Sequence, residues 1–383
     1  MVAYTSYSTD ARVIKQAETA IRAGYSVDFL TLKEAGKART EVLHQVRIFR
    51  LGVEQYDGGR FAGYLVSYLH FFLRCFIRVT MLHIKKRYRI IHVNNMPDIL
   101  VFTTLLPKLC GAKIILDIHD PMPEIFRAKF KGSSSNLLYH LIRLLEKWSV
   151  TYANKVLTVN EPVKNCLIAR TRIPEGKITV VANYPDAMFS KGADHYDTAF
   201  PVRMVYHGTI AERYGFEDAL RALSAVEQRE NMRLTIIGES SYGTILTRLI
   251  EDLGLENTVH FENKRYPLAQ LPDLLRHFHL GFVPYERSPA IDYILPVKLL
   301  ELLSLGIPAI TFQSSTIESY LDKSMYFTYS PECPQTLTDV VNQIIMNPAL
   351  LLEKRNAILH NQHPFRWEQE AEKYLQVIRR LAT

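Results

Sequence analysis

A lysine and a glutamate lie three residues apart in the segment 293–308, YILPVKLLELLSLGIP, at Lys298 and Glu301. Side chains at this spacing project from the same face of a helix. Pro296 suits the first turn of such a helix, and Gly306 suits its left-handed end. The unpaired N–H groups of the first turn would favour an anion such as a diphosphate, while Glu301 could accept hydrogen bonds from sugar hydroxyls. These residues suggest a nucleotide site, and an amphipathic core helix with a solvated ion pair is the alternative.

The elements that must position this helix follow a repeating pattern, in which short apolar β-rich runs alternate with helical stretches. Such alternation is typical of parallel sheets covered by helices. In the first half we expect helices at 10–23 and 98–110, and strands at 2–4, 26–32, 46–51, 90–93, 113–118 and 155–159. In the second half we expect strands at 203–207, 233–238, 259–262, 280–284 and 309–312.

The length of 383 residues exceeds one ordinary hydrophobic core and indicates two domains. We expect an α/β fold with two doubly wound Rossmann-like domains that face each other across a cleft, where ligands bind at the carboxyl ends of the strands. The expected domains are 1–185 and 186–364, with a C-terminal helix in 365–383 that crosses back to the first domain. The first strand is short, which leaves open whether the native chain starts upstream of Met1.

The composition describes a folded, soluble protein with 48% hydrophobic and 22% charged residues. The net charge of +7 indicates an anionic partner such as a nucleotide, a nucleic acid or an acidic lipid. No signal peptide and no uninterrupted apolar run of about 18 residues is recognised, so the chain is expected to be neither exported nor membrane-spanning. The cysteines are too far apart to suggest a zinc site or a disulfide framework, which fits a reducing cytosol: Cys75, Cys110, Cys166 and Cys333.

Several stretches in order along nearly the whole chain resemble motifs of the retaining GT-B glycosyltransferases of family 4. They are TDARVIKQAETAIRAGYSVDFL at 9–30, HVNNMPDIL at 92–100, GAKIILDIHDPMPE at 111–124, YHGTIAERYGFEDAL at 206–220, IIGES at 236–240, PVKLLELLSLGIP at 296–308 and FRWEQEAEKYLQVIRRL at 365–381. The resemblance implies an acceptor-side first domain and a nucleotide-sugar-binding second domain.

The resemblance also implies a donor site in the second domain. Glu301 stands at the second carboxylate of the family's E-x7-E motif, which holds the donor ribose, whereas Tyr293 replaces the first carboxylate. Arg213 and Lys298 are expected to bind the diphosphate, although Arg213 could also be an ordinary surface arginine. The remaining donor-binding candidates follow predicted strands: Gly208, Thr209, Gly238 and Glu239.

On the acceptor side, the resemblance makes His119 an active-site histidine at the end of the strand IILDIH. Asp117, inside that strand, could orient it. Asp10, Arg12 and Glu124 are acceptor-side candidates, but Asp10 has an N-cap as its structural alternative, and Glu124 is equally well explained as structural. Asn183 falls in the loop between the domains, where it could touch the donor or fix a turn.

The implied activity moves a sugar from a nucleotide-diphosphate sugar to a lipid-linked or polysaccharide acceptor, with retention of configuration. His119, Arg213 and Lys298 would be the catalytic groups, and neither a metal nor another cofactor is expected. The altered E-x7-E motif keeps two alternatives open. One is a sugar-nucleotide epimerase or hydrolase of the same fold, and the other is a non-catalytic glycosyltransferase-like binding subunit.

The segment 64–89 mixes aromatic residues with six Lys and Arg residues. A basic, aromatic helix is typical of binding to an anionic membrane surface, and a buried helix with a solvated basic tail is the alternative. No nucleic-acid recognition motif accompanies the charge, so nucleic acid is not expected as a partner. The predicted location is cytoplasmic and peripheral, at the inner face of the cytoplasmic membrane.

Overall fold

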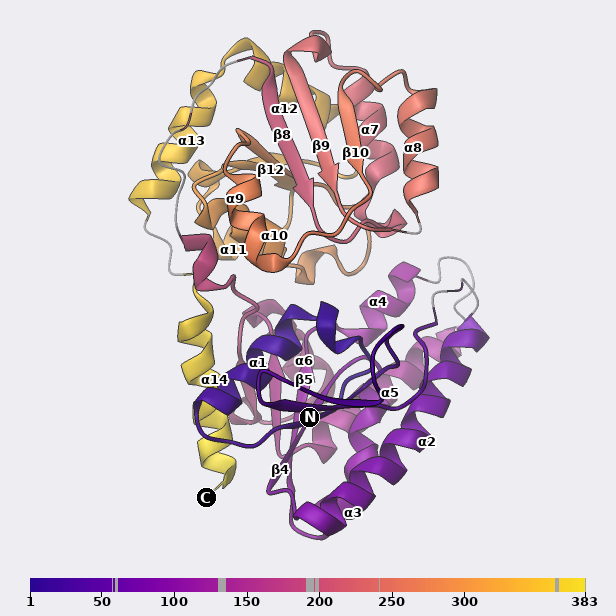
Figure 1. Cartoon of the computed structure of the whole chain (residues 1–383). Coiled ribbons are helices and arrows are strands. Elements are labelled where there is room, and N and C mark those ends of the chain that lie inside the picture. The colour runs from indigo at the N-terminus through magenta and orange to yellow at the C-terminus, as the bar shows by residue number, and fades with distance from the viewer. Residues whose placement is uncertain are drawn as a thin grey trace. The chain divides into compact units, whose positions relative to one another are not determined.

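The chain forms two compact units in a computed structural model, which describes residues 1–56, 58, 61–129, 136–190, 196, 200–240, 242–361 and 365–382. Unit 1 comprises residues 1–183 and 369–383, and unit 2 comprises residues 184–368. In each unit, helices surround a sheet of mainly parallel strands (Figure 1). The expected α/β class is confirmed.

Unit 1 contains a sheet in two parts with strand orders β2-β3-β1 and β4-β5-β6-β7. Val2 forms parallel bridges to both Leu30 of β1 and Val93 of β4, so it joins the two parts. Among the described strands of this unit, only the β2–β3 pair is antiparallel. The strands are β1 Asp28–Thr31, β2 Thr40–Leu43, β3 Val46–Arg50, β4 Ile90–Asn94, β5 Lys113–Ile118, β6 Lys155–Thr158 and β7 Ile178–Val180.

The helices of unit 1 include the longest of the described chain, α2. They are α1 Ala11–Arg22, α2 Phe61–Lys86, α3 Leu105–Leu109, α4 Met122–Lys129, α5 Asn136–Tyr152 and α6 Glu161–Thr171. The C-terminal helix α14, Trp367–Ala382, contributes most of its length to unit 1. There Glu370 accepts a hydrogen bond from the backbone of Ala182 at 2.7 Å, and Tyr374 bonds His92 at 3.0 Å.

Unit 2 is built on one parallel sheet of order β10-β9-β8-β11-β12-β13. Its strands are β8 Val202–His207, β9 Met232–Ile237, β10 Val259–Glu262, β11 Leu280–Val283, β12 Ala309–Phe312 and β13 Phe327–Tyr329. Its helices are α7 Phe216–Ser224, α8 Gly243–Asp252, α9 Leu271–Leu275, α10 Val297–Ser304, α11 Ser315–Tyr320, α12 Gln335–Met346 and α13 Ala349–His360. Helices α7 and α8 lie beside β9 and β10 (Figure 1).

The expected strands agree closely with these bounds, but five elements differ. The first strand is reduced to the bridges of Val2. The edge strands β2, β7 and β13 are absent from the predictions, which relied on long apolar runs. Strand β2 is mostly exposed, and the other two have three residues each. The expected helix 98–110 is a 3-10 helix, Asp98–Thr104, followed by α3. Thr103 and Thr104 there donate their hydroxyls to carbonyls three residues back.

A buried carboxylate ties the elements of unit 1 together. Asp117 in β5 is fully buried and receives two hydrogen bonds from the Arg12 guanidinium, at 2.9 and 2.8 Å. Gln16 of the same helix donates to it at 2.6 Å, and His92 Nε2 lies 3.7 Å away. Although burial alone would raise the pKa of Asp117, the neighbouring Arg12 and His92 hold it well below its usual range. Arg12 also donates to the carbonyl of Val181 at 2.9 Å.

Removing the buried cation should destabilise unit 1 strongly. We expect Arg12→Ala to lower the free energy of unfolding by about 3–5 kcal/mol, because Asp117 would remain buried and uncompensated. Arg22, at the exposed end of the same helix, provides the control, and Arg22→Ala should change it by less than about 0.5 kcal/mol. Hydrogen exchange of the β5 amides measures both, since a two-domain chain need not unfold in one transition. Equal effects of the two substitutions would contradict this view of Asp117.

Candidate functional site

The lysine of helix α10 lies in an aromatic cage in unit 2. Lys298 Nζ donates to the Tyr206 hydroxyl at 2.5 Å and to the carbonyl of Thr209 at 3.2 Å. The ammonium also lies 4.4 Å from the ring centroids of both Tyr206 and Tyr214, at distances typical of cation–π contacts. Pro296 precedes the helix without a side-chain cap, so the first N–H groups of α10 have no side-chain acceptor there.

This cage lowers the pKa of Lys298 to about 7, mainly through burial. The nearby Arg213 adds to the decrease, and Glu301 opposes it. Lys298 is therefore near the midpoint of its titration at neutral pH. An anion bound beside it would favour the charged form and raise that pKa.

Glu301 lies one turn further along α10 and faces strand β8. Its Oε2 atom is 3.6 Å from Nε2 of His207, which is buried at the end of that strand. Burial and the charge of Lys298 lower the pKa of His207 to about 3, so this imidazole is neutral near pH 7. The predicted short helix that carries both Lys298 and Glu301 is present, and each side chain lies near a residue at the end of β8.

Two glycines allow the loop after β8 to approach the loop after β9. A Cβ atom added to Gly238 would lie 2.1 Å from the carbonyl oxygen of Gly208. A Cβ added to Gly208, whose φ is +98°, would lie 2.8 Å from Cε of Lys298. The loop is fixed further by Ser240, whose hydroxyl donates to the carbonyl of Ile210 at 2.7 Å. Glycine at both positions is therefore a steric requirement of this site.

The other donor-side candidates lie around this centre. Arg213 is exposed, and its guanidinium lies 4.9 Å from the ring centroid of Tyr214. Thr209 and Glu239 are exposed on the two loops. Tyr293 ends a short 3-10 helix, Ile291–Tyr293, before α10, and its neighbour Asp292 accepts a hydrogen bond from Ser315 at 3.4 Å.

Sequence reasoning missed the aromatic and histidine part of this site. Tyr206, His207 and Tyr214 all occur in the stretch YHGTIAERY, but aromatic residues at the end of a strand ordinarily indicate core packing. Tyr206 and Tyr214 are neighbours of Lys298 only because α10 lies beside the end of β8 in the folded unit.

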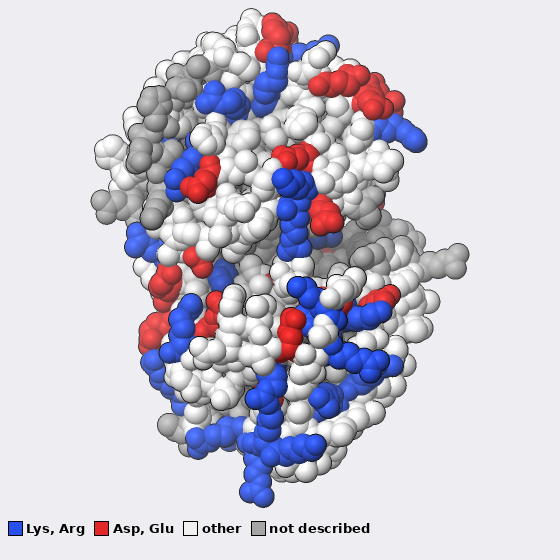
Figure 2. Space-filling model, in the orientation of Figure 1, with Lys and Arg blue, Asp and Glu red and all other residues white. Residues whose placement is uncertain are grey.

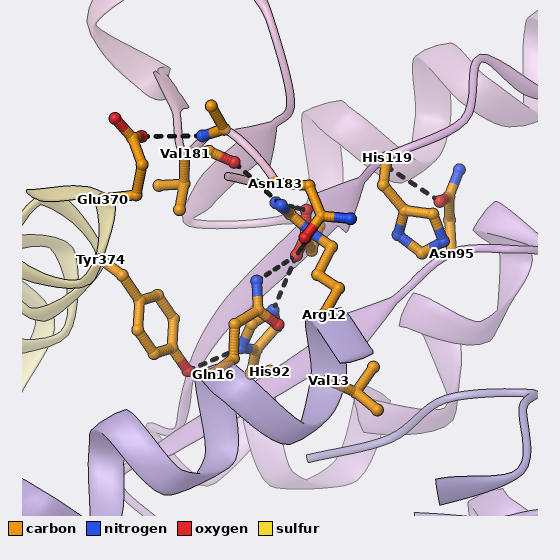
Figure 3. Close-up of polar contacts among 12 residues, drawn as sticks. Arg12, Val13, Gln16, His92, Asn95, His119, Val181, Asn183, Glu370 and Tyr374 are labelled. Atoms are coloured by element: carbon orange, nitrogen blue, oxygen red, sulfur yellow. Dashed lines mark hydrogen bonds and ion pairs between the residues drawn. The ribbon is translucent and has the colours of Figure 1, made fainter. Parts of the chain in front are cut away.

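In unit 1, His119 follows β5 directly and is half-buried at the carboxyl end of the sheet. Asn95, which follows β4, accepts a hydrogen bond from the His119 backbone at 3.1 Å (Figure 3). The Asn95 amide donates to Asp98 at 3.0 Å and to the carbonyl of Asp120 at 2.7 Å. Burial raises the pKa of Asp98 to about 6. Asn95 was not singled out from the sequence, although a polar residue just after a strand was a usable signal.

Three acceptor-side candidates have structural partners in the fold. Arg12 is 3% exposed, and its guanidinium is bound by Asp117 and by the carbonyl of Val181. Glu124 forms a two-oxygen ion pair with Arg170 at 2.9 and 3.2 Å, in line with its structural alternative. Asp10 caps α1 through the backbone N–H groups of Arg12 and Val13. Asn183, also considered for the donor, accepts a bond from Lys15 at 3.0 Å.

Helix α2 bears on the expectation that the chain does not span a membrane. Among the described residues, it is long and apolar enough to do so by length and composition alone, with a mean hydropathy of 1.4. Part of it nevertheless packs inside unit 1, where Phe71, Cys75 and Val79 are buried. Its opposite side exposes a stripe of large apolar residues, here called the α2 stripe: Leu65, Val66, Leu69, Leu73, Ile77, Met81 and Ile84.

Two family models match the chain, one in each half. The model described as Glycosyltransferase Family 4 matches residues 11–187, and the model described as Glycosyl transferases group 1 matches residues 201–347. Among curated proteins, a chitobiosyldiphosphodolichol beta-mannosyltransferase of Candida albicans is 20% identical over 304 residues. That match covers 73% of this chain and 65% of the relative.

Solved structures of similar fold cover nearly all of the chain. Sucrose-phosphate synthase from Thermosynechococcus elongatus has a TM-score of 0.77 at 16% identity, covering 99% of this chain and 98% of its own. The Anabaena protein HepE, in complex with UDP-glucose, has a TM-score of 0.70 at 14% identity, covering 98% of both chains. At these identities the likeness concerns the fold.

The close approach of Gly208 and Gly238, in the loops after β8 and β9, can be tested directly. We expect Gly238→Ala to destabilise unit 2 by about 1–3 kcal/mol and to shift the loop 208–215, because backbone atoms oppose the new methyl group. Gly176→Ala is the control, since its Cβ would meet no atom within 4 Å. Thermal unfolding and hydrogen exchange of residues 207–215 report the two effects. Unchanged exchange in Gly238→Ala would show that the loops do not depend on this approach.

Proposed function

We propose that this chain, a GT-B glycosyltransferase by fold and by family resemblance, transfers a sugar from a nucleotide-diphosphate sugar to a lipid-linked or polysaccharide acceptor. The observation that carries the proposal is the position of Lys298 beside Glu301 at the uncapped start of α10. A cation, a carboxylate and unpaired N–H groups at one point suit a diphosphate linked to a ribose.

The proposed role of unit 2 is to hold the donor and to stabilise the departing diphosphate. Lys298, the N–H groups at the start of α10 and the exposed Arg213 would meet the charge that develops on the leaving group. Glu301 would accept hydrogen bonds from the ribose hydroxyls. These groups supply the positive charge from the chain itself, so we propose transfer without a metal ion.

The proposed role of unit 1 is to present His119 toward the reacting groups. The Asn95 amide fixes the backbone on both sides of this histidine through the His119 N–H and the Asp120 carbonyl. We propose that the acceptor hydroxyl attacks from the face that the leaving group occupies, with the departing phosphate as the proton acceptor, so that configuration is retained. The curated relative is named a beta-mannosyltransferase. Comparison of donor and product anomers by NMR therefore decides between retention and inversion here.

We further propose that the enzyme works at an anionic membrane surface on the cytoplasmic side. The α2 stripe supports this, because it is apolar, exposed and followed by the basic residues Arg87 and Arg89. The helices α3 and α5 add further exposed apolar residues to unit 1: Leu105, Leu106, Leu109, Leu137, Leu141, Leu144 and Trp148.

Nucleotide binding tests the donor site. We expect one of UDP, GDP or dTDP to stabilise the protein by about 2.7 kcal/mol at 100 times its Kd. Affinity should fall as the pH rises through about 7, because Lys298 loses its charge, and binding near that pH should take up a proton. We expect Lys298→Met to weaken binding roughly tenfold or more and to remove this pH dependence. Titration calorimetry in two buffers of different ionisation enthalpy measures both quantities.

Lys264 offers a matched control for that experiment. It is an exposed lysine 4.4 Å from the ring centroid of Tyr266 in the same unit, so Lys264→Met removes a similar cation–π contact outside the site. Failure of all three nucleotides to stabilise the protein would refute the donor site. Rapid consumption of a sugar nucleotide without any acceptor would instead favour the hydrolase or epimerase alternative.

The membrane proposal predicts that a charge in the α2 stripe weakens vesicle binding. Leu73→Glu should reduce binding to anionic vesicles about tenfold, because it places a carboxylate where a leucine would enter the apolar layer. Val42→Glu is the control, since Val42 is similarly exposed but lies on β2. Flotation assays measure both, and equal losses in the two variants would argue against docking through α2.

A further inference from the structure

Unit 1 contains a cavity of about 550 Å³ that the proposed transfer reaction does not use. Its walls come from the end of α2, the turn before β4, the turn before β5 and the end of α14. Strands β4 and β5 begin at this cavity, whereas Asn95 and His119 follow their other ends. The cavity therefore lies at the amino edge of the sheet, and the candidate active-site residues lie at the carboxyl edge.

Three cations line this cavity, and none of its described lining residues is acidic. Arg87 ends the turn after α2, Arg89 precedes β4 and Lys113 begins β5. The Arg89 carbonyl accepts a hydrogen bond from the Lys113 N–H at 2.8 Å, which fixes these two cations on neighbouring strands. All three side chains are exposed, and no carboxylate pairs with them among the described residues. Such a concentration of positive charge attracts an anion.

A buried histidine forms part of the same wall. His83 is 8% exposed, and its Nδ1 atom has no hydrogen-bond partner in the described structure. Burial lowers its pKa, so it is mainly neutral at pH 7 and can act as a hydrogen-bond donor or acceptor. The cavity thus combines fixed cations with an unsatisfied polar group.

The apolar surface of unit 1 continues into this cavity. Ile84, the last residue of the α2 stripe, is 72% exposed and lines the cavity wall. Leu109, 76% exposed, directly precedes the lining residue Cys110. Lys and Arg side chains gather on unit 1 near the point where β4 begins (Figures 1 and 2). A cationic cavity at the end of an apolar stripe matches an amphiphile with an anionic head.

We propose that this cavity binds the phosphate headgroup of an anionic membrane lipid whose acyl chains lie along the α2 stripe. The proposal rests on the membrane docking described above but does not depend on sugar transfer. Arg87, Arg89 and Lys113 would contact the phosphate, and Ile84 would adjoin the first carbons of the acyl chains. The bound lipid would hold unit 1 on the membrane by its amino edge and leave the edge with His119 to the acceptor.

Vesicle binding by the whole chain tests this proposal. We expect Arg87→Gln, Arg89→Gln and Lys113→Gln each to weaken binding to phosphatidylcholine vesicles that contain phosphatidylglycerol by about fivefold. Lys85→Gln is the matched control, because Lys85 is exposed two residues from Arg87 but does not line the cavity. We expect this control to change binding by less than about twofold. Melting temperatures establish that the variants fold.

A second variant tests the cavity without changing any charge. Cys110→Trp should fill the space, since Cys110 is exposed on its wall, and should weaken phosphatidylglycerol-dependent binding as strongly as the arginine substitutions. If Lys85→Gln is as harmful as Arg87→Gln, or if Cys110→Trp has no effect, the cations act as a diffuse field and the proposal is wrong.

Soluble glycerol 3-phosphate separates the two sources of the phosphate group. Binding of this probe without vesicles, at the affinity seen for vesicles and with the same loss in the variants, would identify a free phosphate ester as the ligand and overturn the lipid proposal. Vesicle binding that far exceeds binding of the probe supports it. Sugar transfer to a water-soluble acceptor should be unchanged in all four cavity variants, so failure of this proposal can be told from failure of the proposed activity.

Discussion

The compensation of one buried charge sets the architecture of unit 1. Asp117 lies inside β5 without contact to water, and a carboxylate in that position is tolerated only when cations and donors surround it. Arg12 and Gln16 from α1 meet this requirement, and His92 extends the network to Tyr374 of α14. The network therefore fixes the helices around the strand that carries His119 at its end. The position of His119 is a consequence of the charge two residues before it.

In unit 2, by contrast, the charge of Lys298 is only partly compensated. Lys298 is surrounded mainly by tyrosine rings and a backbone carbonyl, so burial is only partly compensated and its pKa falls to about 7. The close approach of Gly208 and Gly238 maintains this cage, because any larger residue would displace a loop. Asp117 is satisfied and structural, whereas Lys298 remains responsive to an incoming anion. Burial of a charged side chain thus gives a stable core in one unit and a candidate ligand site in the other.

The two edges of the unit 1 sheet differ in chemistry, as the proposed membrane docking requires. The carboxyl edge carries His119, which is held by Asn95 in a polar network. The amino edge carries Arg87, Arg89 and Lys113 around an open cavity beside the α2 stripe. Because parallel strands all run in the same direction, one edge can serve substrates while the other meets a surface.

The sequence by itself determined the local features of this protein. Buried strands such as β5 and β12, the cap of α1 at Asp10 and both ends of α10 follow from patterns of neighbouring residues. Only the tertiary structure decided which charges are structural. Arg12 meets a carboxylate 105 positions away, and Lys298 meets Tyr206 across 92 positions. A charged side chain is solvated, paired or left reactive according to what the fold places opposite it, and sequence spacing does not contain that information.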